Sequence, residues 1–316
     1  MKHLFRFAAL TGAAILTLSV LTACGTSPAK TDGLRIVTTT YAAYDMAKQL
    51  TAQYTQPAAV TLLLTPGGES HSYEPSPADV AAIQSCELFV YIGGESEVWA
   101  DKLISASRAE KENLRMFDCV ELLNEETVEG MEADEEDEEE DVPDEHIWTS
   151  PLNADAMLSA LHDTLNRIAP EEAANCDAAF APLHEDFLAL DQKAKEIKAN
   201  QRTNTLVFAD RFPFRYLTDA YGWDYYAAFS GCSSDTDASA ATLSFLISKV
   251  QEQNIGTVFY LENSSQKISD AVCRATGAKA VMMQSGNNVS AEDFKAGRHY
   301  QDIMEENLAA IQEALS

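Results

Sequence analysis

Two histidines occupy matching positions in the first half of the chain. His71 and His146 each precede a Ser-Pro dipeptide by a few residues, at Ser76-Pro77 and at Ser150-Pro151. Ser-Pro is typical of a helix start, because serine caps the first turn and proline suits its first position. Two imidazoles presented by equivalent loops can coordinate one ion, whereas a lone histidine is more often structural. The pair therefore predicts a metal site.

His146 also closes a strongly acidic run. Residues 125–145 contain fourteen acidic side chains, and apolar residues follow directly after His146. Such a run cannot fold compactly by itself, because like charges repel and little can be buried. Two interpretations stay open: a flexible anionic collector that concentrates cations beside a fixed site, and a solvated surface tether.

Oxygen donors follow the strands expected in the second half. Ligands of open parallel sheets bind outside the carboxyl ends of the strands, where this sequence has Asp210, Glu262 and Gln284. Carboxylates beside imidazole suit zinc or manganese. Each carboxylate is equally able to cap a helix or form a salt bridge instead of binding a metal. Arg211 is the adjacent residue with which Asp210 would form a salt bridge. The candidate metal ligands are thus His71, His146, Asp210, Glu262 and Gln284.

Short apolar runs alternate with amphipathic segments, which predicts an α/β fold with parallel sheets and crossover helices. The expected strands are residues 34–39, 59–64, 88–92, 114–118, 206–209, 223–229, 257–261 and 280–283. The expected helices are residues 41–53, 77–84, 97–107, 151–170, 171–200, 213–221, 238–253, 264–276 and 298–315. We expect two α/β lobes, residues 33–150 with the acidic loop 125–145 and residues 201–316, joined by a long helical connector at 151–200.

The N-terminus has the pattern of an export signal. Lys2 and Arg6 precede an apolar stretch at residues 7–20, and Leu21-Thr22-Ala23-Cys24 follows. This stretch is too short for a stable membrane span. The tetrapeptide resembles the lipobox of bacterial lipoproteins, which implies a signal peptide at 1–23, lipidation of Cys24 and a tether at 24–32. We therefore expect an extracytoplasmic protein anchored to the bacterial cell membrane.

The charge balance excludes one class of partner. The chain has 22 basic and 50 acidic residues and a formal net charge of −28. Loss of residues 1–23 removes Lys2 and Arg6 and no acid, which brings the net charge to −30. A field of this sign repels nucleic acid and attracts cations.

The sequence contains no pattern that supports catalysis. It has no HExxH, nucleophile elbow or phosphate-binding glycine loop, and no positioned set of acid, base and nucleophile is recognisable. Besides Cys24 there are five cysteines and no CxxC, which argues against a disulfide framework or a zinc knuckle. Cys232 differs from the others because it lies in a loop. We therefore expect a binding protein and no enzyme.

Several segments together resemble one known family. They are Thr38-Thr39-Thr40-Tyr41, residues 66–77 with His71, YIGGESEVW at 91–99, HIWTSPLN at 146–153, FRYLTDAYGW at 214–223 and the tail from Asn288. The mature chain resembles, over nearly its whole length, the solute-binding lipoproteins of bacterial zinc and manganese ABC importers, the ZnuA/TroA-like group. The resemblance implies two α/β lobes joined by a rigid long helix, with one divalent cation in the cleft.

The resemblance also implies ligands, and here the sequence departs from the family. His71 and His146 match the first two ligands. The third falls at Arg211, which cannot bind a metal, so Asp210 is a candidate substitute. The fourth falls near Gln284, which offers only a neutral amide oxygen. Either the site is rearranged, with oxygens from Asp210, Glu262 or the acidic loop, or its metal affinity is weak.

These observations lead to one expectation and two alternatives. We expect a monomeric component of an ABC importer that captures a divalent cation, zinc before manganese, and delivers it to the membrane permease. One alternative is a binding protein for a metal chelate, or for an anion paired with Arg211. The other is a surface adhesin on the same fold. Imidazole with oxygen ligands suits zinc, manganese and iron alike.

Overall fold

The computed structural model describes residues 33–68, 72–107, 111–132, 142–233 and 237–316. Several predictions fall outside these ranges. They are the leader and tether with Cys24, the candidate ligand His71, and the central part of the acidic run at 133–141. Within the described part of the chain, no helix has the length and apolar character needed to cross a membrane.

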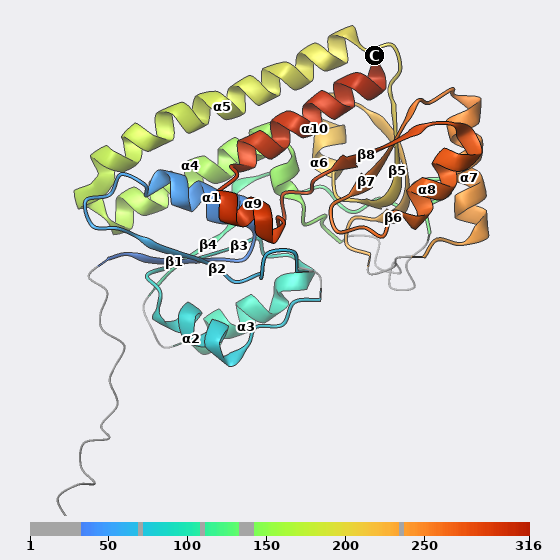
Figure 1. Cartoon of the computed structure of the whole chain (residues 1–316). Coiled ribbons are helices and arrows are strands. Elements are labelled where there is room, and N and C mark those ends of the chain that lie inside the picture. The colour runs from blue at the N-terminus through green and yellow to red at the C-terminus, as the bar shows by residue number, and fades with distance from the viewer. Residues whose placement is uncertain (1–32, 69–71, 108–110, 133–141, 234–236) are drawn as a thin grey trace, which may run out of the picture. The chain divides into compact units, whose positions relative to one another are not determined.

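The first lobe is built on a four-stranded parallel sheet of order β2-β1-β3-β4. Its strands are β1 (Arg35–Thr38), β2 (Ala59–Leu62), β3 (Leu88–Tyr91) and β4 (Glu112–Arg115), and its helices are α1 (Tyr41–Leu50), α2 (Pro77–Ser85) and α3 (Val98–Ala106). Figure 1 shows α2 and α3 below this sheet and α1 above it. Ser76 caps α2 by accepting a hydrogen bond from the Asp79 N–H, while the Asp79 side chain accepts one from the Ser76 N–H.

The second lobe repeats this plan with a sheet of order β6-β5-β7-β8, again parallel. Its strands are β5 (Thr205–Phe212), β6 (Asp224–Ser230), β7 (Thr257–Leu261) and β8 (Lys279–Met283). Its helices are α6 (Arg215–Tyr221), α7 (Ala240–Glu252), α8 (Lys267–Thr276) and the short α9 (Ala291–Ala296). Parallel strands need crossover connections, and the helices between these strands supply them.

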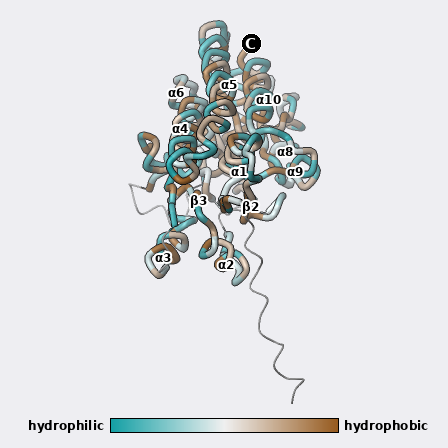
Figure 2. Tube along the Cα trace, turned by 90° about the vertical axis from the view of Figure 1, so that its left-hand side faces the viewer, coloured by the Kyte–Doolittle hydropathy of each residue, from teal (hydrophilic) through white to brown (hydrophobic). Residues whose placement is uncertain are grey.

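Three long helices form a layer along both sheets: α4 (Pro151–Ile168), α5 (Ala173–Asn200) and α10 (Tyr300–Leu315) (Figure 1). With 28 residues, α5 continues through Pro182 and is roughly 40 Å long at 1.5 Å per residue. Figure 2 shows hydrophilic and hydrophobic residues alternating along α5 and α10, as expected of helices with one face on a core.

One hydrophobic core runs through both lobes. It includes Ile36 of the first sheet, Leu161 and Phe187 of the helical layer, and Phe208 and Met283 of the second sheet. All five side chains are completely buried. Residues 151–200 are therefore packed against both sheets, and they are part of the core as well as a connection.

The predicted fold class, two parallel-sheet α/β lobes with a long helix, is confirmed. The fourth strand was placed wrongly: β4 ends at Arg115, and Met116–Cys119 form a 3₁₀ turn that buries Met116 and Phe117. The apolar run there reflects burial in a turn, which hydrophobicity alone does not distinguish from a strand. The short helix α9 was not predicted.

The described ends of the acidic run are ordered. Glu125 donates its N–H to the Val142 carbonyl at 2.8 Å, and the Glu132 N–H bonds to the Ala228 carbonyl of β6 at 2.9 Å. Glu126 pairs with Arg215 at 3.2 Å and Glu129 with Lys249 at 3.5 Å. Residues 125–132 thus lie along the surface of the second lobe, with the side chains of Glu126 and Glu129 still exposed to solvent. The collecting role of residues 133–141 stays a prediction.

Candidate metal centre

A cavity of about 260 Å³ lies where loops from both lobes meet. Its walls come from residues that follow β2, β5, β6, β7 and β8, together with the loop before α4. The described lining residues are Gly67, Gly68, His146, Arg211, Pro213, Gly231, Leu261, Glu262, Asn263, Ser285, Asn287 and Asn288. The carboxyl ends of the strands therefore form the cavity, as the rule for parallel sheets predicts.

His146 lies in the wall of this cavity with only 2% of its surface exposed. Its Nδ1 is 3.2 Å from Oδ1 of Asp144, and the same oxygen accepts the His146 backbone N–H at 2.8 Å. A carboxylate on Nδ1–H fixes the ring and leaves Nε2 with the lone pair that can bind a cation. A Cβ on Gly231 would lie 3.1 Å from the imidazole, so a glycine at 231 gives the ring its space.

The surroundings of His146 favour its charged form. Burial by itself lowers the pKa of His146, but the charge and hydrogen bond of Asp144 and the charges of Glu145 and Glu125 outweigh it. The pKa is therefore raised above its usual 6.5. A site that stabilises imidazolium in this way also attracts a metal cation, because both are positive charges beside the same carboxylates.

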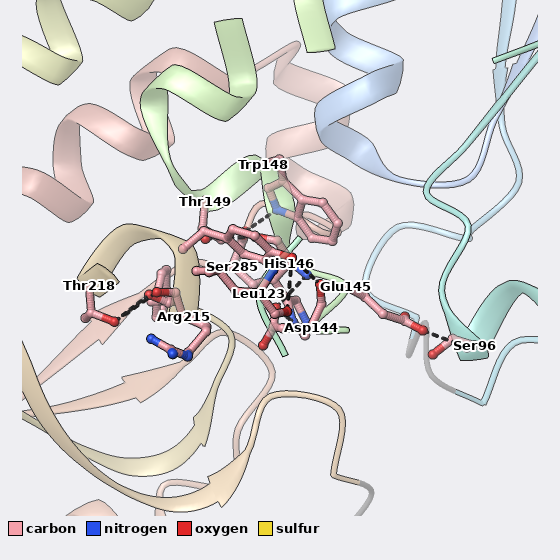
Figure 3. A network of polar contacts seen from close by, with 12 residues as sticks. Ser96, Leu123, Asp144, Glu145, His146, Trp148, Thr149, Arg215, Thr218 and Ser285 are labelled. Carbon is pink, nitrogen blue, oxygen red and sulfur yellow. Dashed lines mark hydrogen bonds and ion pairs between the residues drawn. The ribbon is translucent and has the colours of Figure 1, made fainter. Parts of the chain in front are cut away.

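Contacts from both lobes hold the loop that carries His146 (Figure 3). The Ser96 N–H donates to Glu145 at 2.7 Å, and the Tyr216 hydroxyl donates to the Asp144 carbonyl at 2.9 Å. The indole N–H of Trp148 donates to the Ser285 carbonyl at 2.8 Å. The apolar residues that follow the acidic run are thus fixed in the core, and they position the imidazole.

Glu262 is the second metal-capable side chain of the cavity wall. Its Oε2 accepts the Ser285 N–H at 2.9 Å, and its Oε1 accepts the Ser285 hydroxyl at 2.5 Å. Burial raises the pKa of Glu262 to about 7, although Ser285 and the charge of Arg211 act in the opposite direction. A cation at this carboxyl would displace a proton at neutral pH.

Asp210 and Gln284 do not line the cavity. Asp210 accepts the N–H of Arg211 at 2.9 Å and of Leu261 at 3.0 Å, so its carboxylate joins the ends of β5 and β7. The backbone of Gln284 is bonded to Asn307 at 3.0 Å and 2.7 Å. The structure therefore brings together His146 and Glu262 of the predicted set, and His71 lies outside the described residues.

Arg211 lines the cavity in place of its neighbour Asp210. The pairing of β5 with β6 is irregular between Phe208 and Arg211, where three steps along β5 match two steps along β6. An extra residue of this kind turns the following side chains to the other face of a strand. The irregularity explains why the sequence position alone did not show which of the two residues faces the cavity.

Cys232 follows the cavity residue Gly231. Burial raises the pKa of its thiol well above the usual value, and the charges of Glu125, Glu145 and Asp144 raise it further. The thiol therefore stays protonated and is a poor nucleophile. Among the residues that the structure describes, no three His, Cys, Asp or Glu side chains converge as a metal cluster.

Sequence reasoning missed the role of Asp144. An aspartate two residues before a metal-capable histidine is the signal that would have shown it, but here it is one of fourteen acidic residues in the run. In the folded chain Asp144 is only 2% exposed and lies beside the His146 ring.

A two-lobed α/β fold with a buried imidazole in the cavity between its strand ends is the architecture of the class of solute-binding proteins. Within that class, the chain belongs to the family described as "Zinc-uptake complex component A periplasmic" (ZnuA), whose family model matches residues 36–314. The resemblance to the ZnuA/TroA-like group is thereby confirmed. This family consists of transport proteins, in keeping with the expected absence of catalysis.

Two curated relatives show the extent of the similarity. The zinc-binding lipoprotein AdcA of Streptococcus pneumoniae (serotype 4) is 31% identical over 297 residues, which cover 93% of this chain and 58% of AdcA. The high-affinity zinc uptake system protein ZnuA of Bacillus subtilis is 28% identical over 300 residues, with 92% and 90% coverage. The chain thus spans under two thirds of AdcA and most of the Bacillus protein.

Solved structures agree with the fold. The Zn(II)-bound ZnuA-like domain of S. pneumoniae AdcA has a TM-score of 0.74 at 29% identity, covering 90% of this chain and 99% of that domain. The laminin binding protein Lmb of Streptococcus agalactiae, described as bifunctional with adhesin and metal transporting activity, has a TM-score of 0.75 at 22% identity, with 90% and 100% coverage. The second likeness shows the fold alone.

Proposed function

We propose that this protein captures a divalent cation, zinc before manganese, outside the cytoplasm and delivers it to a membrane ABC permease. The observation that carries the proposal is the buried His146, backed by Asp144 and placed in a cavity between the lobes. The zinc-binding and zinc-uptake names of the relatives support the same cargo.

The proposed ligands are His146 and Glu262, with His71 as a second imidazole. His71 lies outside the described residues, but Gly67 and Gly68, which precede it by a few positions, line the cavity. Imidazole nitrogens and a carboxylate oxygen form a donor set that zinc accepts readily. Asp210 and Gln284 are not proposed as direct ligands, because neither lines the cavity.

The same proposal covers location and assembly. In this proposal the protein is exported, anchored through a lipidated Cys24 and monomeric. These properties are consistent with a carrier that delivers an ion to a permease. The lipoprotein name of the AdcA relative supports the anchoring. An adhesive function on this fold is not proposed, because the likeness to Lmb carries the fold alone.

Zinc titration calorimetry on the purified protein tests the proposal. We expect one binding site that is lost in His146→Ala. His184→Ala is the matched control, since His184 pairs with Asp155 at 2.6 Å away from the cavity. Several weak, salt-sensitive sites that persist in His146→Ala would instead identify the acidic run as the metal binder, and the importer function would then lose its basis.

A further inference from the structure

We propose that Asn288 is a positioning residue of the metal site, because it fixes the turn of the first lobe from which the chain continues to His71. This inference rests on the proposed function, since it concerns how the same cavity presents its ligands. It adds a residue that acts on the metal without binding it, through the backbone that leads to a ligand.

The turn at Thr65–Gly68 follows β2, and two of its glycines line the cavity. Its last N–H donates to its first carbonyl at 2.8 Å. Pro66 and Gly67 lie at its centre, and Gly67 has a φ of +81°, as a type II turn requires at this position. His71 follows the turn by three residues. The end of the turn is therefore the point from which the chain leaves the cavity wall toward His71.

Asn288, from the loop between β8 and α9 of the second lobe, holds both ends of this turn. Its side-chain nitrogen donates to the Thr65 carbonyl at 2.9 Å and to the Gly68 carbonyl at 2.8 Å. Its side-chain oxygen accepts the Val289 N–H at 2.8 Å. Both N–H groups of the amide are thus used on the turn, and an alanine at this position would remove both bonds.

The backbone beside this amide adds a third bond and reaches the opposite wall of the cavity. The Gly67 N–H donates to the Val289 carbonyl at 2.8 Å. At the start of the same segment, Ser285 donates its N–H and its hydroxyl to the Glu262 carboxylate. Residues 285–289 therefore contact a proposed ligand at one end and the turn at the other.

A fixed turn matters here because metal ligands must lie within about 0.2 Å of their ideal distances. Groups that orient ligands from outside the coordination sphere typically contribute about 10- to 100-fold to metal affinity. The bonds from Asn288 order the turn in the folded protein, so less ordering is left to occur when the metal binds. Asn288 should therefore raise zinc affinity through the chain that leads to His71.

Competition with a fluorescent zinc chelator tests this inference on the purified protein. We expect Asn288→Ala to bind zinc about tenfold more weakly than the wild type. Asn288→Ser keeps one donor on a shorter side chain and should lose less. It also keeps the test decisive if Asn288→Ala does not fold.

Asn307→Ala is the matched control. Asn307 is as buried as Asn288, and its side chain bonds both backbone groups of Gln284, just before the segment at 285–289. This substitution should lower Tm as Asn288→Ala does, because each removes a buried amide with its hydrogen bonds. Its zinc affinity should stay within about twofold of the wild type.

A double-mutant cycle with His71→Ala separates positioning from general destabilisation. If Asn288 acts through the chain to His71, Asn288→Ala should change the zinc affinity of the His71→Ala variant by less than about twofold. A merely structural loss would instead add in full to the effect of His71→Ala.

Three outcomes would overturn the inference: wild-type zinc affinity in both Asn288 variants, an equal loss in Asn307→Ala, or a full tenfold loss that persists beside His71→Ala. In each case, zinc binding that is lost in His146→Ala leaves the proposed function standing. Zinc binding that does not depend on His146 would overturn the proposed function, and this inference with it.

Discussion

Nδ1 of His146 lies 3.2 Å from Oδ1 of Asp144, and the two side chains are only 2% and 3% exposed. An aspartate in this position orients the imidazole and strengthens it as a donor to metal. The pair joins the end of the acidic run to the cavity, and several of the following predictions depend on it.

Asp144→Asn should weaken zinc binding by about 10- to 100-fold, because the amide keeps the shape but not the charge that supports the imidazole. Competition with a fluorescent zinc chelator measures the change. Asp177→Asn is the matched control, since Asp177 bonds His162 at 2.7 Å on the helical layer. Equal affinities of Asp144→Asn and the wild type would show that Asp144 does not act on the metal.

The stability of the zinc-free protein should depend on His146 most strongly at low pH. The pKa of His146 in the folded state is raised, with burial opposing and Asp144, Glu145 and Glu125 prevailing. Such a group stabilises the fold fully below its unfolded pKa of about 6.5, and the contribution is lost as pH rises through the folded pKa. Urea unfolding of His146→Ala and wild type at pH 5.5 and pH 8.5 should therefore show the larger difference at pH 5.5.

Zinc binding should have the opposite pH dependence. Zinc requires neutral imidazole, so protons compete with it, and a raised pKa makes that competition begin at a higher pH. The zinc-induced rise in Tm should therefore shrink steadily from pH 8.5 to pH 5.5 at a fixed zinc concentration. A zinc effect that stays constant over this range would argue against ligation by His146.

Glu97→Gln should make the protein less sensitive to alkaline pH. Burial raises the pKa of Glu97 to about 7, although its carboxyl accepts the N–H of Ile92 at 2.7 Å and of Gly93 at 2.9 Å. When the pKa of a carboxyl group is higher in the folded than in the unfolded state, the protein loses stability as the pH rises from the unfolded to the folded pKa value. For Glu97 this loss is roughly 3 kcal/mol of unfolding free energy between pH 4.5 and pH 8.

Urea unfolding at pH 5.5 and pH 8.5 measures this effect. The wild type should lose stability between the two values, and Glu97→Gln should lose less. Glu95→Gln, an exposed neighbour in the same 3₁₀ turn, should retain the wild-type dependence. Identical pH dependence of Glu97→Gln and the wild type would exclude a protonated Glu97 in the fold.

Gly130→Ala should detach the first part of the acidic run from the second lobe. Gly130 has a φ of +82°, and a Cβ there would overlap the ring of Phe245. We expect a loss of about 1–3 kcal/mol of unfolding free energy and faster proteolysis within the run. At Gly256 a Cβ would meet nothing within 4 Å, so Gly256→Ala should change stability by less than about 0.5 kcal/mol. Equal effects of the two substitutions would contradict the packing of residue 130.

The sequence by itself determined the elements of the fold and the family. Alternation of short apolar runs with amphipathic segments reflects a parallel sheet covered by helices, and this pattern is local and easily read. The β4 boundary and the short helix α9 were missed. Apolar residues buried in a 3₁₀ turn resemble a strand, and a short helix has little periodicity to detect.

Only the tertiary structure decided how the cavity is composed. In the sequence, Asp210, Glu262 and Gln284 are comparable candidates because all three follow or end strands, and Arg211 is only a possible partner of Asp210. The tertiary structure distinguishes these residues through the irregular pairing of β5 with β6 and through the bonds of Asp210 to Arg211 and Leu261. It also buries Asp144 beside His146. These relationships join residues of different elements, and they arise from packing that no local pattern of residues specifies.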